Sequence, residues 1–184
     1  MRCFLAIPLS DEIKDYLFLL IKDIKKEFNK YNIKASFVPK KNLHITLMFL
    51  GEINNNEIIK IKNSISSMKF KPFKFKLKNI GSFPNETLAR VLWIGINPEK
   101  DVINLQKSVD TTLLDIVGLK RDHEFGAHIT LARAKSPSKI SIAIKNITLK
   151  EVEQYVDSFG IYRSELHKDG AKYFLIEKFE MNYT

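Results

Sequence analysis

Three long segments of the chain carry apolar residues at helical spacing. Ser10, followed by acidic residues and an i, i+3, i+4, i+7 apolar pattern, predicts an amphipathic helix over residues 10–28. The same spacing predicts helices over 54–68 and, opened by Pro98, over 98–117. Each helix therefore has one face suited to cover a core.

Other segments show the period of two that is typical of strands. In 73–80, "FKFKLKNI", phenylalanine and leucine alternate with lysine, which gives one apolar and one basic face. The remaining predicted elements are strands at 2–8, 88–96, 152–163 and 171–181 and a short helix within 138–146. Asp169-Gly170 is a hairpin turn signal between the last two strands.

Two further apolar segments contain the same four letters, "HITL", at 44–47 and 128–131, which are 84 residues apart. Successive side chains of a strand point to opposite faces. His44 and Thr46 therefore share one face of their strand, while Ile45 and Leu47 share the other. A single histidine in an apolar strand is more often a hydrogen-bonded core residue. Its repetition with a threonine each time favours a functional site.

The order helix, HITL strand, helix, strand, strand occurs twice, which suggests a duplication. "ARVLWI" at 89–94 also resembles "AKYFLI" at 171–176. We therefore expect an α+β fold of two lobes, each with an antiparallel sheet and helices, in one domain that spans 1–184. Equivalent strands should meet face to face across a central cleft.

The composition indicates in which cellular compartment the protein is expected. The chain has 184 residues, 45% of them hydrophobic, and the longest apolar run is far shorter than the roughly 20 residues that span a bilayer. Asp11 and Glu12 end the first apolar run too early for a secretory signal. The single cysteine, Cys3, fits a reducing compartment. We expect a cytoplasmic protein, a monomer, with no membrane partner.

The net charge of +9 suits a polyanionic partner, although lysine-rich usage can also reflect genome composition. The basic face of Lys74, Lys76 and Lys78 either guides an RNA backbone or is a solvated strand face. Phe83 and Trp93 either stack on a terminal base or, as we expect, belong to the core.

Two histidines and two threonines without a carboxylate or thiol nucleophile suit proton transfer at a phosphate. A neutral imidazole accepts a proton from water, an imidazolium donates one to a leaving oxygen, and hydroxyls donate to phosphate oxygens. Hydrolysis or transesterification of a phosphodiester fits this set. The sequence has neither a His-Glu-x-x-His or cysteine cluster for a metal nor a Gly-x-x-x-x-Gly-Lys phosphate loop, so we expect no cofactor.

The ordered set "MRCFLAIPL", "NLHITLMFLGE", "ARVLWIGI", "HITLAR" and "YRSELHKDGAKY" resembles the 2H phosphoesterase superfamily. Within it, the chain is most similar to the RNA 2′,3′-cyclic phosphodiesterases, historically called 2′-5′ RNA ligases. The resemblance implies a bilobal α+β fold with both motifs in a central cleft. It also implies opening of a terminal 2′,3′-cyclic phosphate to a 2′-phosphate without metal or ATP.

The resemblance also assigns roles that the pseudo-symmetric residues leave open. It makes His44 the proton donor to the departing O3′ and His128 the proton acceptor that activates water. Thr46 and Thr130 would bind phosphate oxygens. Arg133, five residues after His128, would help to bind the phosphate. Simple alternation puts Arg133 on the opposite face from His128, so a bulge or strand end must redirect it.

The substrates expected on this basis are RNA 3′ ends that carry a cyclic phosphate, although tRNA fragments, other RNA ends and a small cyclic nucleotide all fit a cleft of this chemistry. Two alternatives stay open at this stage. One is a 2′-5′ RNA ligase that joins the cyclic phosphate to a 5′-hydroxyl end. The other is a non-catalytic RNA-binding module that has kept the cleft.

Overall fold

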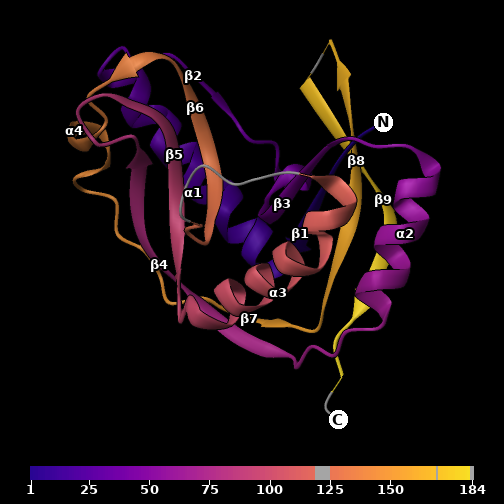
Figure 1. The fold of residues 1–184 in the computed structure, drawn as a ribbon. Coiled ribbons are helices and arrows are strands. Elements are labelled where there is room, and N and C mark those ends of the chain that lie inside the picture. Colours follow the sequence, from indigo (N-terminus) through magenta and orange to yellow (C-terminus); the bar gives the residue numbers. More distant parts are fainter. Residues whose placement is uncertain (119–124, 169, 183–184) are drawn as a thin grey trace.

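The computed structural model describes residues 1–118, 125–168 and 170–182. It contains an antiparallel sheet and helices that cover it (Figure 1). In chain order the elements are β1 (Arg2–Pro8), α1 (Asp11–Lys30), β2 (Ala35–Phe37), the 3-10 turn η1 (Lys40–Asn42), β3 (His44–Glu52), α2 (Asn55–Ser66), β4 (Phe73–Phe83), β5 (Ala89–Asn97), α3 (Lys100–Val117), β6 (His128–Ser138), α4 (Ser141–Ile144), β7 (Glu153–Val156), β8 (Ser158–His167) and β9 (Gly170–Glu180).

The predicted cap at Ser10 is confirmed, and α2 and α3 each have one well-formed end, although α3 begins at Lys100 and not at Pro98. The Ser10 hydroxyl accepts a hydrogen bond from the Ile13 amide at 3.3 Å and so caps α1. Asn54 caps α2 in a reciprocal arrangement with Glu57. Helix α3 ends at Gly118, whose φ of 63° lies in the left-handed region that glycine adopts without strain.

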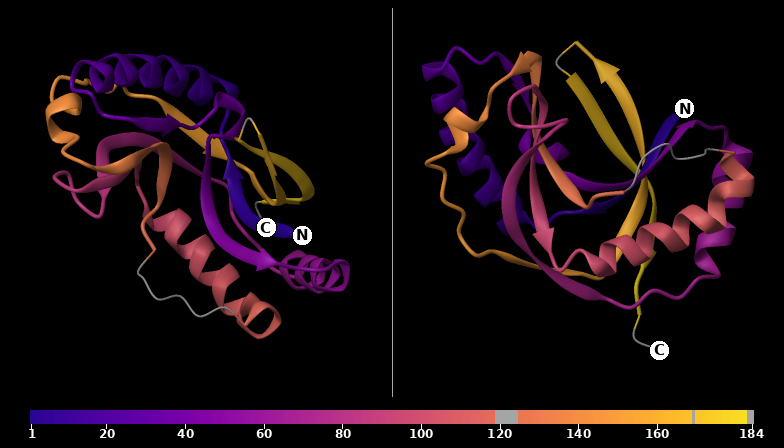
Figure 2. Two further views of the ribbon diagram at one scale, coloured as in Figure 1. Left: turned by 90° about the horizontal axis from the view of Figure 1, so that it is seen from above. Right: turned by 60° about the vertical axis from the view of Figure 1, so that its left-hand side comes forward.

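The described strands form one nine-stranded sheet in the order β7-β4-β5-β6-β3-β1-β8-β9, with β2 paired to β6 as a side branch. The two HITL strands, β3 and β6, are the central neighbours. Each is followed outward by three antiparallel strands, so the sheet has two four-stranded halves. Figure 2 shows these halves curving around the space between them. The predicted two-lobed α+β fold is confirmed.

The two halves of the sheet do not correspond to the two successive halves of the chain. Strand β8 comes late in the chain but pairs with β1 in the first half. Helix α3 follows β5, yet it packs against α2 and β3. Helix α1 follows β1 and packs against α4. Each half of the sheet therefore contains strands from both the earlier and the later part of the chain.

Three predictions from the sequence about the placement and pairing of the strands are wrong. The halves meet edge to edge through β3 and β6 rather than face to face. "ARVLWI" lies in β5, beside β6, whereas "AKYFLI" lies in β9 at the edge of the sheet, so the structural counterpart of β5 is β1. The predicted strand 152–163 is split between β7 and β8, which pair with different neighbours.

The β8–β9 hairpin is confirmed by the pair His167–Gly170, while Asp169 lies outside the described residues.

Two of the three lysines on the basic face of β4, Lys74 and Lys76, form ion pairs with glutamates, while Lys78 is exposed. The Lys74 ammonium lies 2.8 Å from Glu153, and Lys76 pairs with Glu151. These partners lie on or just before β7, the neighbouring edge strand. The arrangement favours a charged strand face over an RNA guide. Within the described ranges, no helix is both long and apolar enough to cross a membrane.

Candidate active site

The two HITL motifs contact each other through their middle residues. Ile45 of β3 and Ile129 of β6 are antiparallel partners, and both are fully buried. In an antiparallel pair, the residues that flank such a position also lie side by side. The register thus sets His44 beside Thr130 and Thr46 beside His128. All four polar side chains are half-buried, as the alternation predicts for a face that borders a pocket.

A bulge follows each motif at the same place. Between β1 and β3 the register steps from Ala6–Thr46 to Leu5–Met48, so Leu47 is the extra residue. Between β5 and β6 it steps from Trp93–Thr130 to Leu92–Ala132, so Leu131 is the extra residue. A bulge reverses the side on which later residues point.

The bulges explain how two exposed side chains reach the pocket. Arg133 and Phe49, each five residues after a motif histidine, both line it. The redirection of Arg133, which alternation alone does not give, is therefore present in the structure. Phe49 is its counterpart in the first half.

The orientation of the His44 ring is set by one backbone carbonyl and one hydroxyl. Its Nδ1 donates to the Asn42 carbonyl at 2.7 Å, and its Nε2 lies 2.8 Å from the Thr46 hydroxyl oxygen. A carbonyl can only accept, so Nδ1 carries the proton and Nε2 faces Thr46 and the pocket. The Asn42 amide donates to the Ala171 carbonyl at 2.7 Å, which fastens this segment to β9. Phe4 and Tyr173 pack on the imidazole, with ring centroids at 5.0 and 5.4 Å.

His128 has an equivalent setting. Its Nδ1 donates to the Gly126 carbonyl at 2.7 Å, so Nε2 is again the free ring nitrogen. Phe83 lies edge-on to the imidazole at 5.2 Å and Trp93 at 6.2 Å. The expectation that both aromatics are core residues is wrong, because Phe83 is 41% exposed and Trp93 is half-buried.

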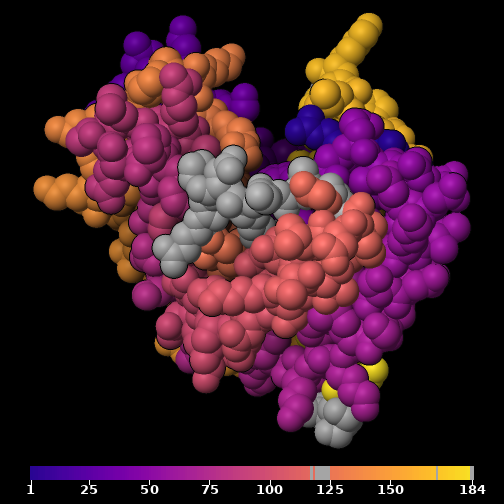
Figure 3. Space-filling model, in the orientation of Figure 1, coloured from indigo at the N-terminus to yellow at the C-terminus, as the bar shows by residue number. Residues whose placement is uncertain are grey.

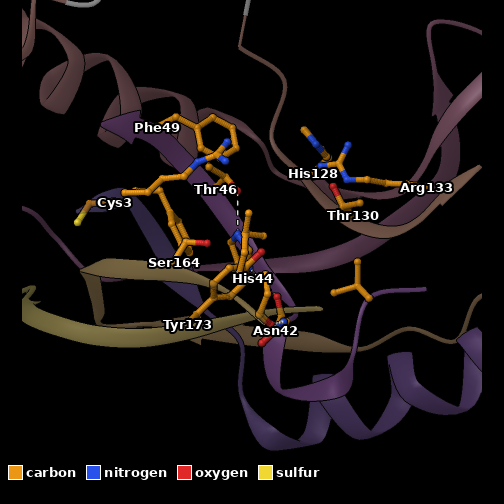
Figure 4. Close-up of a pocket in the computed structure, with 15 residues that line it drawn as sticks. Cys3, Asn42, His44, Thr46, Phe49, His128, Thr130, Arg133, Ser164 and Tyr173 are labelled. Carbon is orange, nitrogen blue, oxygen red and sulfur yellow. Dashed lines mark hydrogen bonds between the residues drawn. The ribbon is translucent and has the colours of Figure 1, made fainter. Parts of the chain in front are cut away.

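The four motif side chains and Arg133 line one cavity of about 350 Å³, a volume suited to a nucleotide-sized ligand. Figure 4 shows His44 and Thr46 on one side of it and His128, Thr130 and Arg133 on the other. The space-filling view in Figure 3 shows a hollow between the two halves of the molecule. Within the part of the chain that the structure describes, no aspartate or glutamate lines this cavity.

The chain is similar in sequence to one family of known proteins. A family model described as LigT like Phosphoesterase matches residues 7–93. An RNA 2′,3′-cyclic phosphodiesterase of Archaeoglobus fulgidus is 35% identical over 98% of this chain and the whole of its own length. The chain belongs to the LigT-like phosphoesterases.

Further relatives agree with this assignment. An RNA 2′,3′-cyclic phosphodiesterase of Methanocaldococcus jannaschii is 34% identical over 97% of this chain and 99% of its own. The crystal structure of TT0787 of Thermus thermophilus has a TM-score of 0.78 at 28% identity, with 98% of each chain covered. Escherichia coli LigT, at 24% identity and a TM-score of 0.77 over 99% of this chain and 98% of its own, shares the fold.

In this LigT-like phosphoesterase the two imidazoles have lowered pKa values. Burial lowers the pKa of His44, the Asn42 carbonyl raises it in part, and positive charge on His128 lowers it again. Burial also lowers the pKa of His128, against the Gly126 carbonyl, and the Arg133 guanidinium lowers it further. Both rings are therefore neutral at pH 7, and each Nε2 is a hydrogen-bond acceptor, in His44 for the Thr46 hydroxyl.

The cavity also offers several donors to an anion. Arg133 and Arg2 both line it, and neither has an ion-pair partner among the described residues. The Thr130 hydroxyl, likewise without a hydrogen-bond partner there, completes the set. No group of three histidine, cysteine, aspartate or glutamate side chains in the described ranges could share a metal ion. The donor set suits a phosphate more than a cation.

Several residues that line the cavity were not predicted from the sequence. Phe49 could have been found, because it has the same offset from His44 as Arg133 has from His128. Asn42 precedes the first motif, but its role depends on a contact with Ala171, which is 129 residues away. Tyr173 and Arg2 lie outside both motifs and reach the site only through the sheet.

Proposed function

We propose that this protein hydrolyses the 2′,3′-cyclic phosphate at the 3′ end of RNA to a 2′-phosphate. Full-length relatives carry the name of this activity. The observation that carries the mechanism is the meeting of two His-x-Thr strands at one cavity, with both Nδ1 atoms held by backbone carbonyls so that both Nε2 atoms face the cavity. The cyclic phosphate lies between the two histidines.

His128 is the base. Its Nδ1–H is held by the Gly126 carbonyl, so the neutral ring presents the lone pair of Nε2 to water. Water attacks phosphorus as its proton passes to this nitrogen. The lowered pKa of His128 keeps the ring neutral, and so competent as a base, at neutral pH.

His44 is the acid. The P–O3′ bond breaks as Nε2 of the imidazolium gives its proton to O3′, which leaves a 2′-phosphate and a 3′-hydroxyl. Burial disfavours the imidazolium of His44 and lowers its pKa. The phosphate's negative charge raises the pKa of His44 on binding and so supplies the proton-bearing form. After the reaction, His128 loses a proton to solvent and His44 regains one.

Thr46, Thr130 and Arg133 stabilise the charge that grows on the non-bridging oxygens. The Thr46 hydroxyl contacts Nε2 of His44 at 2.8 Å. The substrate exchanges this contact for one to phosphate. The reaction needs neither metal nor nucleotide cofactor in this proposal, because the histidines supply both proton transfers.

The natural substrates in this proposal are RNA 3′ ends, including tRNA fragments. The enzyme acts as a monomer of one domain in the cytoplasm. The absence of carboxylates from the described lining of the cavity supports a polyanionic substrate, since no like charge there opposes the incoming phosphate.

An RNA oligonucleotide with a terminal 2′,3′-cyclic phosphate tests the activity. We expect a 2′-phosphate product, distinguished from the 3′ isomer by chromatography, with no loss of rate in excess chelator. Addition of a 5′-hydroxyl oligonucleotide separates hydrolysis from ligation. RNA binding without turnover would instead identify a non-catalytic binding module, and activity that a divalent ion restores would refute the metal-free mechanism.

A further inference from the structure

Arg2 lines the same cavity as both histidines, but it lies at the far end of the strand pair. On β1, Ala6 pairs with Thr46, while Arg2 pairs with Glu52. Arg2 and Ala6 are four positions apart on β1, or about 13 Å along the strand. Arg2 therefore enters the cavity from the end of the strand pair beyond Thr46, away from the position where β3 and β6 meet.

The Arg2 guanidinium has no counter-ion among the described residues. Glu52, its antiparallel neighbour, pairs instead with the Met1 amino group at 3.3 Å. The Arg2 residue is exposed, and the cavity that it lines has no acidic group in the described part of the chain. A cation placed in this way favours an anion as its ligand.

A hydroxyl group accompanies the guanidinium. The pair Cys3–Arg163 sets the register between β1 and β8, and the next position places Ser164 beside Arg2. Ser164 also lines the cavity, and its hydroxyl has no hydrogen-bond partner within the described residues. A guanidinium and a hydroxyl on neighbouring strands together suit a phosphate group.

The direction of the RNA chain follows from the proposed chemistry. His44 protonates O3′, which belongs to the terminal ribose, so this ribose lies on the His44 side of the cavity. The same ribose carries O5′, through which it is joined to the preceding nucleotide. The linking phosphate therefore lies on the side formed by β1, β3 and β8, where Arg2 and Ser164 are found.

We propose that Arg2 and Ser164 bind the phosphodiester that joins the terminal nucleotide to the preceding one. The preferred substrate is then an RNA chain, not a cyclic mononucleotide. This inference rests on the proposed function, because the position of the ribose depends on His44 as the acid.

The test compares three substrates: a cyclic mononucleotide, a dinucleotide with a terminal cyclic phosphate, and the same dinucleotide with a neutral methylphosphonate linkage. Arg2→Gln removes the charge and keeps much of the side-chain length. Arg90→Gln is the matched control, since Arg90 lies on β5, the counterpart of β1, and is exposed outside the cavity. Ser164→Ala tests the hydroxyl.

We expect the wild type to prefer the dinucleotide over the mononucleotide about tenfold in kcat/KM, and the methylphosphonate to lose this preference. Arg2→Gln should lower the ratio about tenfold and Ser164→Ala about threefold, with no change for Arg90→Gln. The preference should also decline with added salt. A ratio that Arg2→Gln leaves unchanged, or equal losses on both substrates, would overturn the inference.

Binding of a 2′-phosphorylated dinucleotide, measured by titration calorimetry, separates this inference from the proposed function. If no cyclic substrate is hydrolysed but Arg2→Gln still weakens this ligand about tenfold, the subsite stands and the proposed activity fails. If hydrolysis proceeds and neither turnover nor binding depends on Arg2, the activity stands and the subsite fails.

Discussion

Ile45 and Ile129, the residues between histidine and threonine in the two motifs, pair directly across the centre of the sheet. Both are fully buried. Among the described residues they are also the one paired position between β3 and β6, so the two halves of the sheet join here. The spacing of the four motif side chains that we propose as catalytic therefore depends on two aliphatic side chains with no role in the proposed chemistry.

Ile45→Ala and Ile129→Ala should each lower the free energy of unfolding by about 3 kcal/mol, because each leaves a cavity in a packed interior. The double variant should deviate from additivity by about 1 kcal/mol, since the residues are in contact. Urea denaturation measures both effects. Ile142→Ala, at an exposed position on α4, is the control and should change stability by less than about 0.5 kcal/mol. Strict additivity at the central pair would contradict the coupling.

His44→Ala and His128→Ala should each lower turnover of a cyclic-phosphate RNA by about 100-fold or more, because each removes one proton-transfer group. Circular dichroism should show that the variants are folded. His167→Ala changes an exposed histidine at the end of β8, which pairs with Glu165, and should keep full activity. Near-normal turnover in either folded motif variant would refute the assignment.

The pH profile should be bell-shaped, with its kcat/KM maximum below pH 6.5. The ordinary imidazole pKa is 6.5, and both rings lie below it. The acid must be charged and the base neutral, so the population with both correct forms is greatest between two depressed pKa values. NMR titration should show both values below 6.5 in the free enzyme and a rise on binding a 2′-phosphate product. A kcat/KM maximum above about pH 7 would contradict this.

Thr46→Val and Thr130→Val keep the side-chain shape and remove the hydroxyl. Each should lower kcat/KM by about 10- to 100-fold, because a donor to the charged transition state is lost. The corresponding serine variants keep the hydroxyl and should retain most activity. Loss in the valine variants without recovery in the serine variants would indicate a packing effect instead.

Gly81→Ala should disturb His128 without touching it. A Cβ at Gly81 would lie 2.4 Å from the Trp93 ring, which packs near His128. The indole must shift, and we expect about a tenfold fall in kcat together with a changed His128 pKa. Adding Trp93→Phe makes room for the new methyl and should restore part of the activity. A single variant with wild-type kinetics and an unchanged pKa would show that Trp93 does not position the ring.

The helices and the motif faces could be predicted because their signals are local. The cap at Ser10 and the alternation through His44 and Thr46 need only neighbouring residues. The strand order could not be read in this way, since β8 reaches β1 from the other end of the chain. The same holds for Asn42, whose anchor is Ala171, and for Arg2, which enters the site only because β1 lies beside β3.

The pairing of β8 with β1, in the half of the sheet that contains β3, has a consequence for synthesis on the ribosome. Strand β1 emerges before the other strands of the sheet and carries five consecutive buried residues, but β8, its outer partner, follows about 150 residues later. Until then one edge of an apolar strand has no partner, which is a known hazard for aggregation. Nascent chains that stop after β7 should therefore depend on chaperones, and the cleft is completed only when nearly the whole chain has been made.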